Sequence, residues 1–124
     1  MGQHAKALPL YEQARAAAAA AGDTKEVGRA CNGLGRCHVD MGQHAQALPL
    51  YEQARAAFAA AGDTAGLGKV CYNFGACHAK MGQYAQALPL LEQARAAYAA
   101  AGDSAGAARV SGYIADCAAR AGRR

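Results

Sequence analysis

The chain has 124 residues, of which 53% are hydrophobic and only 6% aromatic, and it carries a formal net charge of +4 at pH 7. So few large side chains would leave a single compact core thin, and the mild positive charge falls short of the dense basic field of a dedicated nucleic-acid-binding protein. No apolar run reaches the roughly 18 residues that a membrane-spanning helix needs, and the first residues lack the features of a secretory signal. We therefore expect no membrane or nucleic-acid partner and a cytoplasmic location, with the extracellular space as the alternative for a filament.

A 40-residue repeat organises the whole chain. The stretch MGQHAKALPLYEQARA opens the sequence, returns as MGQHAQALPLYEQARA at residues 41–56, and returns again as MGQYAQALPLLEQARA at residues 81–96. The copies are residues 1–40, 41–80 and 81–120, with 121–124 as a remainder, and we interpret them as one repeat domain. A period of this length indicates stacked supersecondary units.

The first half of each copy has the pattern of an amphipathic helix, because its apolar residues recur at steps of three and four. In the middle copy this face comprises His44, Ala47, Leu48, Tyr51, Ala54 and Phe58. Gly62 suits a helix C-terminus and Asp63 suits an N-cap, so together they predict the turn to a second helix. In the first copy, Asp23 and Glu26 have the spacing of a capping box.

Each copy also places a proline inside this first helix, at Pro9, Pro49 and Pro89. A proline removes one backbone donor and crowds the carbonyl four residues back, which costs about 3 kcal/mol deep inside a helix and far less near its start. Gly42 predicts the preceding turn, so Pro49 should lie one to two turns in. The prolines either tune the curvature of the stack or are simply tolerated near a helix start.

The second half of each copy predicts another helix. Its apolar face in the middle copy comprises Leu67, Val70, Cys71, Phe74, Cys77 and His78. Met81 and Gly82 then turn the chain back. Because no segment shows the alternation of a β-strand, we predict an all-α protein of antiparallel helix pairs with six helices.

The segment VCYNFGACHAKMGQYAQALPLLEQARAAY at residues 70–98 resembles a tetratricopeptide repeat (TPR). That family has large and small residues at fixed spacings, and both kinds fall at matching places here. In this segment the matching places are Cys71, Phe74, Gly75, His78, Gly82, Tyr84, Ala87, Leu91 and Ala94. In the preceding copy they are Cys31, Leu34, Gly35, His38, Gly42, His44, Ala47, Tyr51 and Ala54.

Two features depart from the usual TPR pattern. The period is 40 residues rather than about 34, which is similar to the variant in kinesin light chains and Pins-type spindle-orientation adaptors. The first place, usually a large aromatic residue, is Cys31, Cys71 or Ser111. The resemblance implies a TPR-like α-solenoid that begins with the family's second helix, in the order B-A-B-A-B-A, and a role in protein interaction rather than catalysis.

A series of basic residues marks a candidate binding surface. Arg29, Lys69 and Arg109 occupy the same place in successive copies. The resemblance implies that this place lies along the concave groove in which TPR proteins usually bind extended peptides, so an acidic peptide or protein is a candidate partner. A solvated basic face is the alternative. The candidate peptide-binding residues are Arg29, Asn32, Arg36, Lys69, Asn73 and Arg109.

The pairs Cys37-His38 and Cys77-His78 invite a metal-site interpretation. Adjacent residues on a helix point about 100° apart, so one pair cannot grip one ion. We interpret these residues as core packing and predict no metal, no cofactor and no catalytic set. Equivalent positions on stacked helices lie about 8–10 Å apart, beyond the roughly 7 Å that a disulfide allows, so we predict free thiols.

The two ends of the repeat array present apolar faces that internal copies cover with a neighbouring helix. A solenoid normally carries polar caps at its ends. We therefore predict head-to-tail self-assembly and favour a helical filament over a ring. A monomeric TPR adaptor and a fragment of a longer TPR protein are the alternatives. The predicted interface residues are Leu8, Tyr11, Ala14, Val110, Ile114, Cys117 and Ala118.

Overall fold

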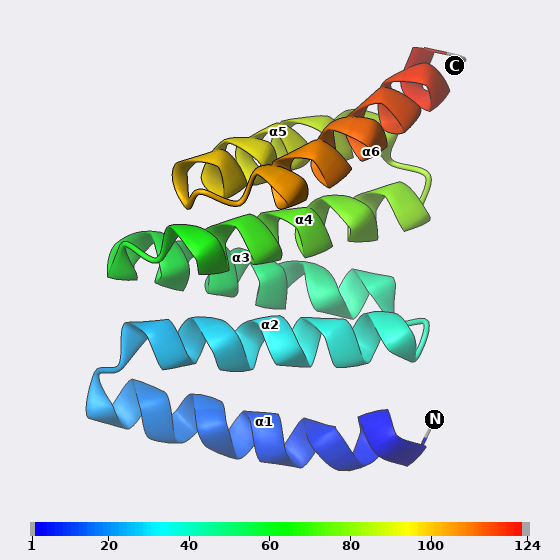
Figure 1. The fold of residues 1–124 in the computed structure, drawn as a ribbon. Helices are drawn as coiled ribbons and strands as arrows, with labels where there is room; N and C mark the ends of the chain where they lie inside the picture. The colour runs from blue at the N-terminus through cyan, green and yellow to red at the C-terminus, as the bar shows by residue number, and fades with distance from the viewer. Residues whose placement is uncertain (1, 123–124) are drawn as a thin grey trace.

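The computed structural model describes residues 2–122, and all the regular structure in that range is helical. The helices are α1 (Gly2–Ala21), α2 (Thr24–Asp40), α3 (His44–Ala61), α4 (Thr64–Lys80), α5 (Tyr84–Ala100) and α6 (Ser104–Gly122). They run antiparallel to their chain neighbours and stack in chain order (Figure 1). The prediction of an all-α solenoid of six helices is confirmed.

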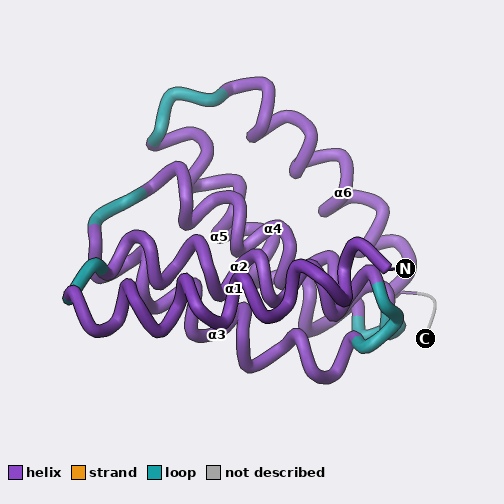
Figure 2. Tube along the Cα trace, turned by 90° about the horizontal axis from the view of Figure 1, so that it is seen from below, coloured by secondary structure: helices purple, strands orange, loops and turns teal. Residues whose placement is uncertain are grey.

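The helices form two layers. Successive helices pack on one another, and α2 also contacts α4 directly. The side chains of Tyr72 and Tyr113 join α4 to α6, with ring centroids 5.8 Å apart. We call α2, α4 and α6 the inner layer and α1, α3 and α5 the outer layer. Seen along the stack, the helices rotate progressively, so that α6 runs obliquely to α1 (Figure 2).

The turns form where the sequence places glycine and aspartate. Every turn between helices contains a glycine in the left-handed region, from φ 68° at Gly62 to 81° at Gly102, which other residues adopt at a cost. Asp63 then caps α4 by accepting a hydrogen bond from the Gly66 amide at 3.1 Å. The Asp23 carboxylate caps α2 in the same way, at 3.2 Å from the Glu26 amide.

The capping box predicted at the start of α2 is only half formed. The Glu26 carboxylate pairs with Arg29 instead of returning to the Asp23 amide. That amide donates to the Ala18 carbonyl at 2.9 Å, within the turn that ends α1. Because the turn already satisfies the Asp23 N–H, the Glu26 side chain is available to a cation one turn along the helix.

Small residues allow the helices of the two layers to approach closely. A β-carbon on Gly35 of α2 would lie 2.6 Å from the Tyr51 ring of α3, and one on Gly75 of α4 would lie 2.8 Å from Leu91 of α5. Ala47 is also fully buried. A side chain at either glycine would force the layers apart, so the small residues at these TPR places set the distance between the layers. Pro49 is the sixth residue of α3, one to two turns in as predicted.

Candidate functional site

Four of the six predicted peptide-binding residues line one cavity. Arg29, Asn32 and Arg36 project from α2, and Lys69 projects from α4. The cavity between these helices has a volume of about 350 Å³. Its remaining lining is Lys25, Phe58, Asp63, Ala65 and Gly66. The structure therefore brings together residues that are separated by up to one full repeat, because α2 and α4 are neighbours in the inner layer.

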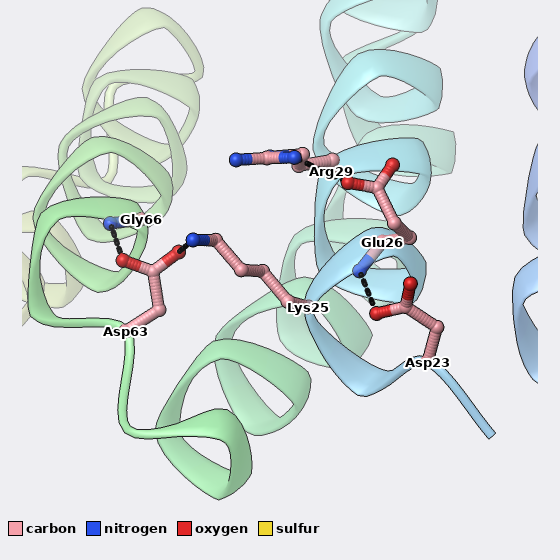
Figure 3. A network of polar contacts seen from close by, with 6 residues as sticks. All are labelled: Asp23, Lys25, Glu26, Arg29, Asp63 and Gly66. Atoms are coloured by element: carbon pink, nitrogen blue, oxygen red, sulfur yellow. Dashed lines mark hydrogen bonds and ion pairs between the residues drawn. The ribbon is translucent and has the colours of Figure 1, made fainter.

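Two of the cations at this cavity are neutralised by the chain itself. The Lys25 ammonium lies 3.8 Å from the Asp63 carboxylate, whose other oxygen caps α4. Arg29 pairs with Glu26 on its own helix. Figure 3 shows Lys25 and Arg29 extending from α2 toward α4, with these carboxylates beside them. The Arg29–Glu26 pair is solvent-exposed on both sides, so it is weak and can exchange its partner. In the other pair, Lys25 is exposed but the Asp63 side chain is only 16% exposed.

Two further cations at the same cavity have no such partner. Arg36 and Lys69 form no ion pair with any of the residues 2–122. Both side chains are exposed. The wall of the cavity therefore carries uncompensated positive charge, which attracts an anion and gives it a fixed place to bind.

Asn73 and Arg109 lie outside this cavity. Asn73 lines a smaller cavity of about 90 Å³ beside Arg36 and Lys80. Its amide donates a hydrogen bond to Asn32 at 3.1 Å, so it links α4 to α2.

Arg109 lines neither cavity. It lies near Tyr98, where burial raises the pKa of the phenol and the charge of Arg109 lowers it. Of the predicted three-residue basic column, Arg29 and Lys69 therefore line the cavity between α2 and α4, while Arg109 lies one repeat further on, in α6.

The repeat pattern could not reveal Lys25, which also lines the cavity. The equivalent residue is Ala65 in the second copy and Ala105 in the third, so no basic column marks the position. The signal that could have found it is helical spacing, because Lys25 and Arg29 are four residues apart and share a face.

His38 and His78 each make a hydrogen bond across the turn that follows their helix. The Nδ1 atoms of His38 and His78 lie 2.7 Å from the side-chain oxygens of Gln43 and Gln83, across the turns that follow α2 and α4. The His78 ring also stacks on Phe74. Among residues 2–122, no three His, Cys, Asp or Glu side chains are grouped in a way that could hold a metal ion.

All five cysteines are buried free thiols. Burial raises the pKa of each, and that of Cys71 reaches about 11. A thiol with so high a pKa is a poor nucleophile at neutral pH.

The outer face of α1 is the main exposed apolar surface of the described chain. Leu10 is 66% exposed and Tyr11 36%, whereas Tyr51 and Leu91, which are equivalent to Tyr11, are 1% and 0% exposed. Of the other residues predicted on this face, Leu8 is half-buried and Ala14 is exposed. The Tyr51 side chain packs against Gly35 of α2 and the Leu91 side chain against Gly75 of α4, whereas Tyr11 has no such contact on this face among residues 2–122.

The predicted interface at α6 is partly wrong. Val110 and Cys117 are 1% and 0% exposed, since they belong to the core that α6 shares with the rest of the stack. Ile114 is half-buried and Ala118 is exposed. Only these two of the four predicted α6 residues are available to a partner.

Two models of the tetratricopeptide repeat match the chain, one over residues 1–60 and the other over residues 68–101. The chain belongs to the tetratricopeptide repeat family. TPR chains act in general as protein-interaction modules without catalytic activity, and that role is the one this fold serves. Among solved structures, the chain is similar to BtubC (BKLC) from P. vanneervenii, with a TM-score of 0.67 and 20% sequence identity.

The alignment with BtubC covers 95% of this TPR chain and 57% of that protein, so the chain spans little more than half of its length. At this level of identity, the similarity concerns the fold. No curated protein matches this sequence. Within residues 2–122, none of the helices has the length and apolar character required to span a membrane.

Proposed function

We propose that this TPR chain is a non-enzymatic scaffold that binds an acidic segment of another protein in the cavity between α2 and α4. The observation that carries the proposal is the presence of two cations, Arg36 and Lys69, on the wall of one cavity without ion-pair partners among residues 2–122. A carboxylate bound there would meet two positive charges without first breaking a pair.

The other residues at the cavity suit a peptide. Asn32 offers amide N–H groups to a backbone carbonyl, since its hydrogen bond with Asn73 uses only its oxygen. Phe58 is among the residues that line the same cavity, although it is only 3% exposed. Arg29 can turn from its exposed partner Glu26 to a ligand with several carboxylates, and the exposed Lys25 ammonium adds positive charge beside it. An acidic segment with more than one carboxylate therefore fits better than a single small anion.

The test is binding of a fluorescently labelled peptide of alternating Glu and Asp residues, followed by anisotropy. Lys69→Glu places a negative charge on the cavity wall and should weaken binding at least about tenfold, or about 1.4 kcal/mol. Lys6→Glu makes the same change of charge on α1, outside this cavity, and is the matched control. Equal losses from both variants would mean only long-range attraction, and the proposal would then fail.

Head-to-tail self-association is a second candidate function. The observation that favours it is the exposure of Leu10 and Tyr11 on α1, where equivalent side chains in the other copies are buried or half-buried. A contact between α6 of one copy and α1 of the next is heterologous, so it gives a ring if the rotation closes and an open helical filament if it does not. The progressive rotation of the stack favours a filament. Light scattering and electron microscopy of the intact chain test it, and a chain that stays monomeric at high concentration would exclude it.

A further inference from the structure

We infer that α6 of one chain docks on α1 of a second copy of the chain. A joint here means the contact between one 40-residue repeat and the next, and the chain contains such joints internally. At the joint between chains, four pairs of residues would meet that correspond to pairs meeting at the internal joints, either with the same kind of contact or with matched changes in size. The inference rests on the second candidate function above and deepens it by naming the residues that meet. Each pair is identified by moving an internal pair along the chain by 40 residues.

The first pair exchanges volume across the joint. A β-carbon on Gly28 would lie 3.0 Å from the Phe58 ring, and one on Gly68 would lie 3.3 Å from the Tyr98 ring. Glycine in α2 or α4 therefore makes room for an aromatic ring in the following outer helix. At the new joint the ring is replaced by Ala18 of the second copy, and the glycine is replaced by Ala108. Alanine thus replaces the glycine at the same joint where alanine replaces the aromatic ring, so the total side-chain volume is partly conserved.

The second pair concerns Tyr11. At the internal joint the Tyr51 ring sits against Gly35, but the residue that would meet Tyr11 of a second copy is Ala115. A methyl group there would clash with a ring placed like that of Tyr51. The Tyr11 ring instead leans on Gly33 of α2, where a β-carbon would overlap it. At the proposed joint, a Tyr11 ring held over Gly33 would leave room for the Ala115 methyl.

The third pair lies between neighbouring inner helices, and at each joint its two members are the same type of residue. Asn32 pairs with Asn73 by a hydrogen bond of 3.1 Å. The next pair along the stack is Tyr72 with Tyr113. The third would be Gly112 with Gly33 of the second copy. The space around Gly112 is open, with no atom within 4 Å of a built β-carbon. Two glycines facing each other let the inner helices approach while Gly33 receives the Tyr11 ring.

The fourth pair extends a series of polar contacts in the outer layer. Arg15 donates to Gln53 at 3.4 Å, and Arg55 donates to Gln93 at 3.3 Å. Each of these glutamine oxygens also lies within 3.5 Å of a cysteine thiol of the preceding inner helix. Arg95 has no glutamine 38 residues further on and reaches the Ser111 hydroxyl instead. Gln13 of a second copy would occupy that place and could accept from both Arg95 and Ser111.

These pairs argue for a second copy as the occupant of the α1 face. Residues far apart in the sequence, such as Ala18 and Ala108 or Gly33 and Ala115, differ from their equivalents in the other repeats in ways that fit contact between them. The joint also continues an interface that the chain already forms twice. An unrelated partner would not need the α6 residues to match the α1 residues.

The test uses two variants that each block one side of the joint. Ala14→Arg blocks the α1 face, because Ala14 is exposed while the equivalent Ala54 is fully buried at the internal joint. Ala115→Arg blocks the α6 face. Both residues are exposed and helical, so arginine leaves the fold intact, which circular dichroism checks. Ala16→Arg is the control, since the equivalent Ala56 stays exposed.

Sedimentation velocity should show that the wild type and the Ala16→Arg control assemble, while each blocking variant alone is monomeric. A mixture of the two blocking variants should form dimers of one copy each and grow no further, because one intact joint remains. The Gly33→Asn variant should weaken assembly by pushing Tyr11 back toward residue 115, and adding Ala115→Gly should restore it.

The possible failures are distinguishable. A wild type that stays monomeric would overturn both self-association and the joint, and would leave the acidic-ligand proposal untouched. A wild type that assembles while the mixed variants form no dimers would overturn the joint alone. Assembly that the Gly33→Asn variant leaves unchanged would also overturn the placement of Tyr11.

Discussion

The outer and inner layers differ in how completely their basic side chains are paired with carboxylates. In the outer layer, each arginine of the repeated EQAR stretch pairs with the glutamate three residues before it, as Arg55 does with Glu52 at 2.8 Å. In the inner layer, Arg36 and Lys69 have no such neighbour and no ion pair within residues 2–122. The outer layer is also nearly constant between copies, whereas the inner layer varies. The difference supports the proposal that the outer layer is a constant frame and the inner layer a variable recognition surface.

The largest expected effect tests how much the buried side chains of the outer layer contribute to the stability of the fold. Tyr51→Ala should lower the free energy of unfolding by about 3–5 kcal/mol, because it empties a fully buried site. Tyr11→Ala, the same change in the same repeat position, should cost about 1 kcal/mol, because that ring is 36% exposed. Urea denaturation of the two variants measures both. Similar losses would show that the first copy is packed as tightly as the second.

A smaller effect concerns how closely the layers approach. Gly35→Ala should cost about 1–3 kcal/mol, because the new methyl group would meet the Tyr51 ring at 2.6 Å. Gly112→Ala, also in the inner layer, should stabilise the monomer by about 0.5–1 kcal/mol, since the site is open and alanine favours a helix. Thermal unfolding under conditions that keep the chain monomeric compares them. Destabilisation by both changes would contradict the assignment of the close crossing to Gly35.

The smallest effect is the pH dependence of stability that the buried thiols produce. Burial raises the pKa of the Cys71 thiol from 9.0 to about 11. The unfolded chain therefore loses this proton at lower pH than the folded chain, and stability falls as the pH rises from about 9 toward 11. A Cys71→Ala variant should show a shallower decline above pH 9 in urea titrations. An identical slope for variant and wild type would mean that the thiol is accessible in the folded state.

Much of the fold can be predicted from the sequence because the same helix and turn patterns occur in all three repeats. The steps of three and four define the helices, Gly62 and Asp63 place a turn and a cap, and Gly35 marks a close crossing. The site is only partly predictable. Equal spacing of Arg29, Lys69 and Arg109 could not show that the cavity lies between α2 and α4 and does not extend to Arg109 on α6. The sequence also could not predict that Val110 and Cys117 are buried within the chain, because core residues and interface residues of a helix are apolar alike.

The most direct test of the central claim is an amide chemical-shift titration of the labelled chain with the Glu- and Asp-rich peptide. The account predicts that the largest shifts fall on α2 and α4 around Asn32, Arg36 and Lys69, and that they are lost in the Lys69→Glu variant. The outer helices, with their paired arginines, should change little. Shifts concentrated on α1, α3 and α5, or spread evenly over both layers, would contradict the assignment of recognition to the inner layer.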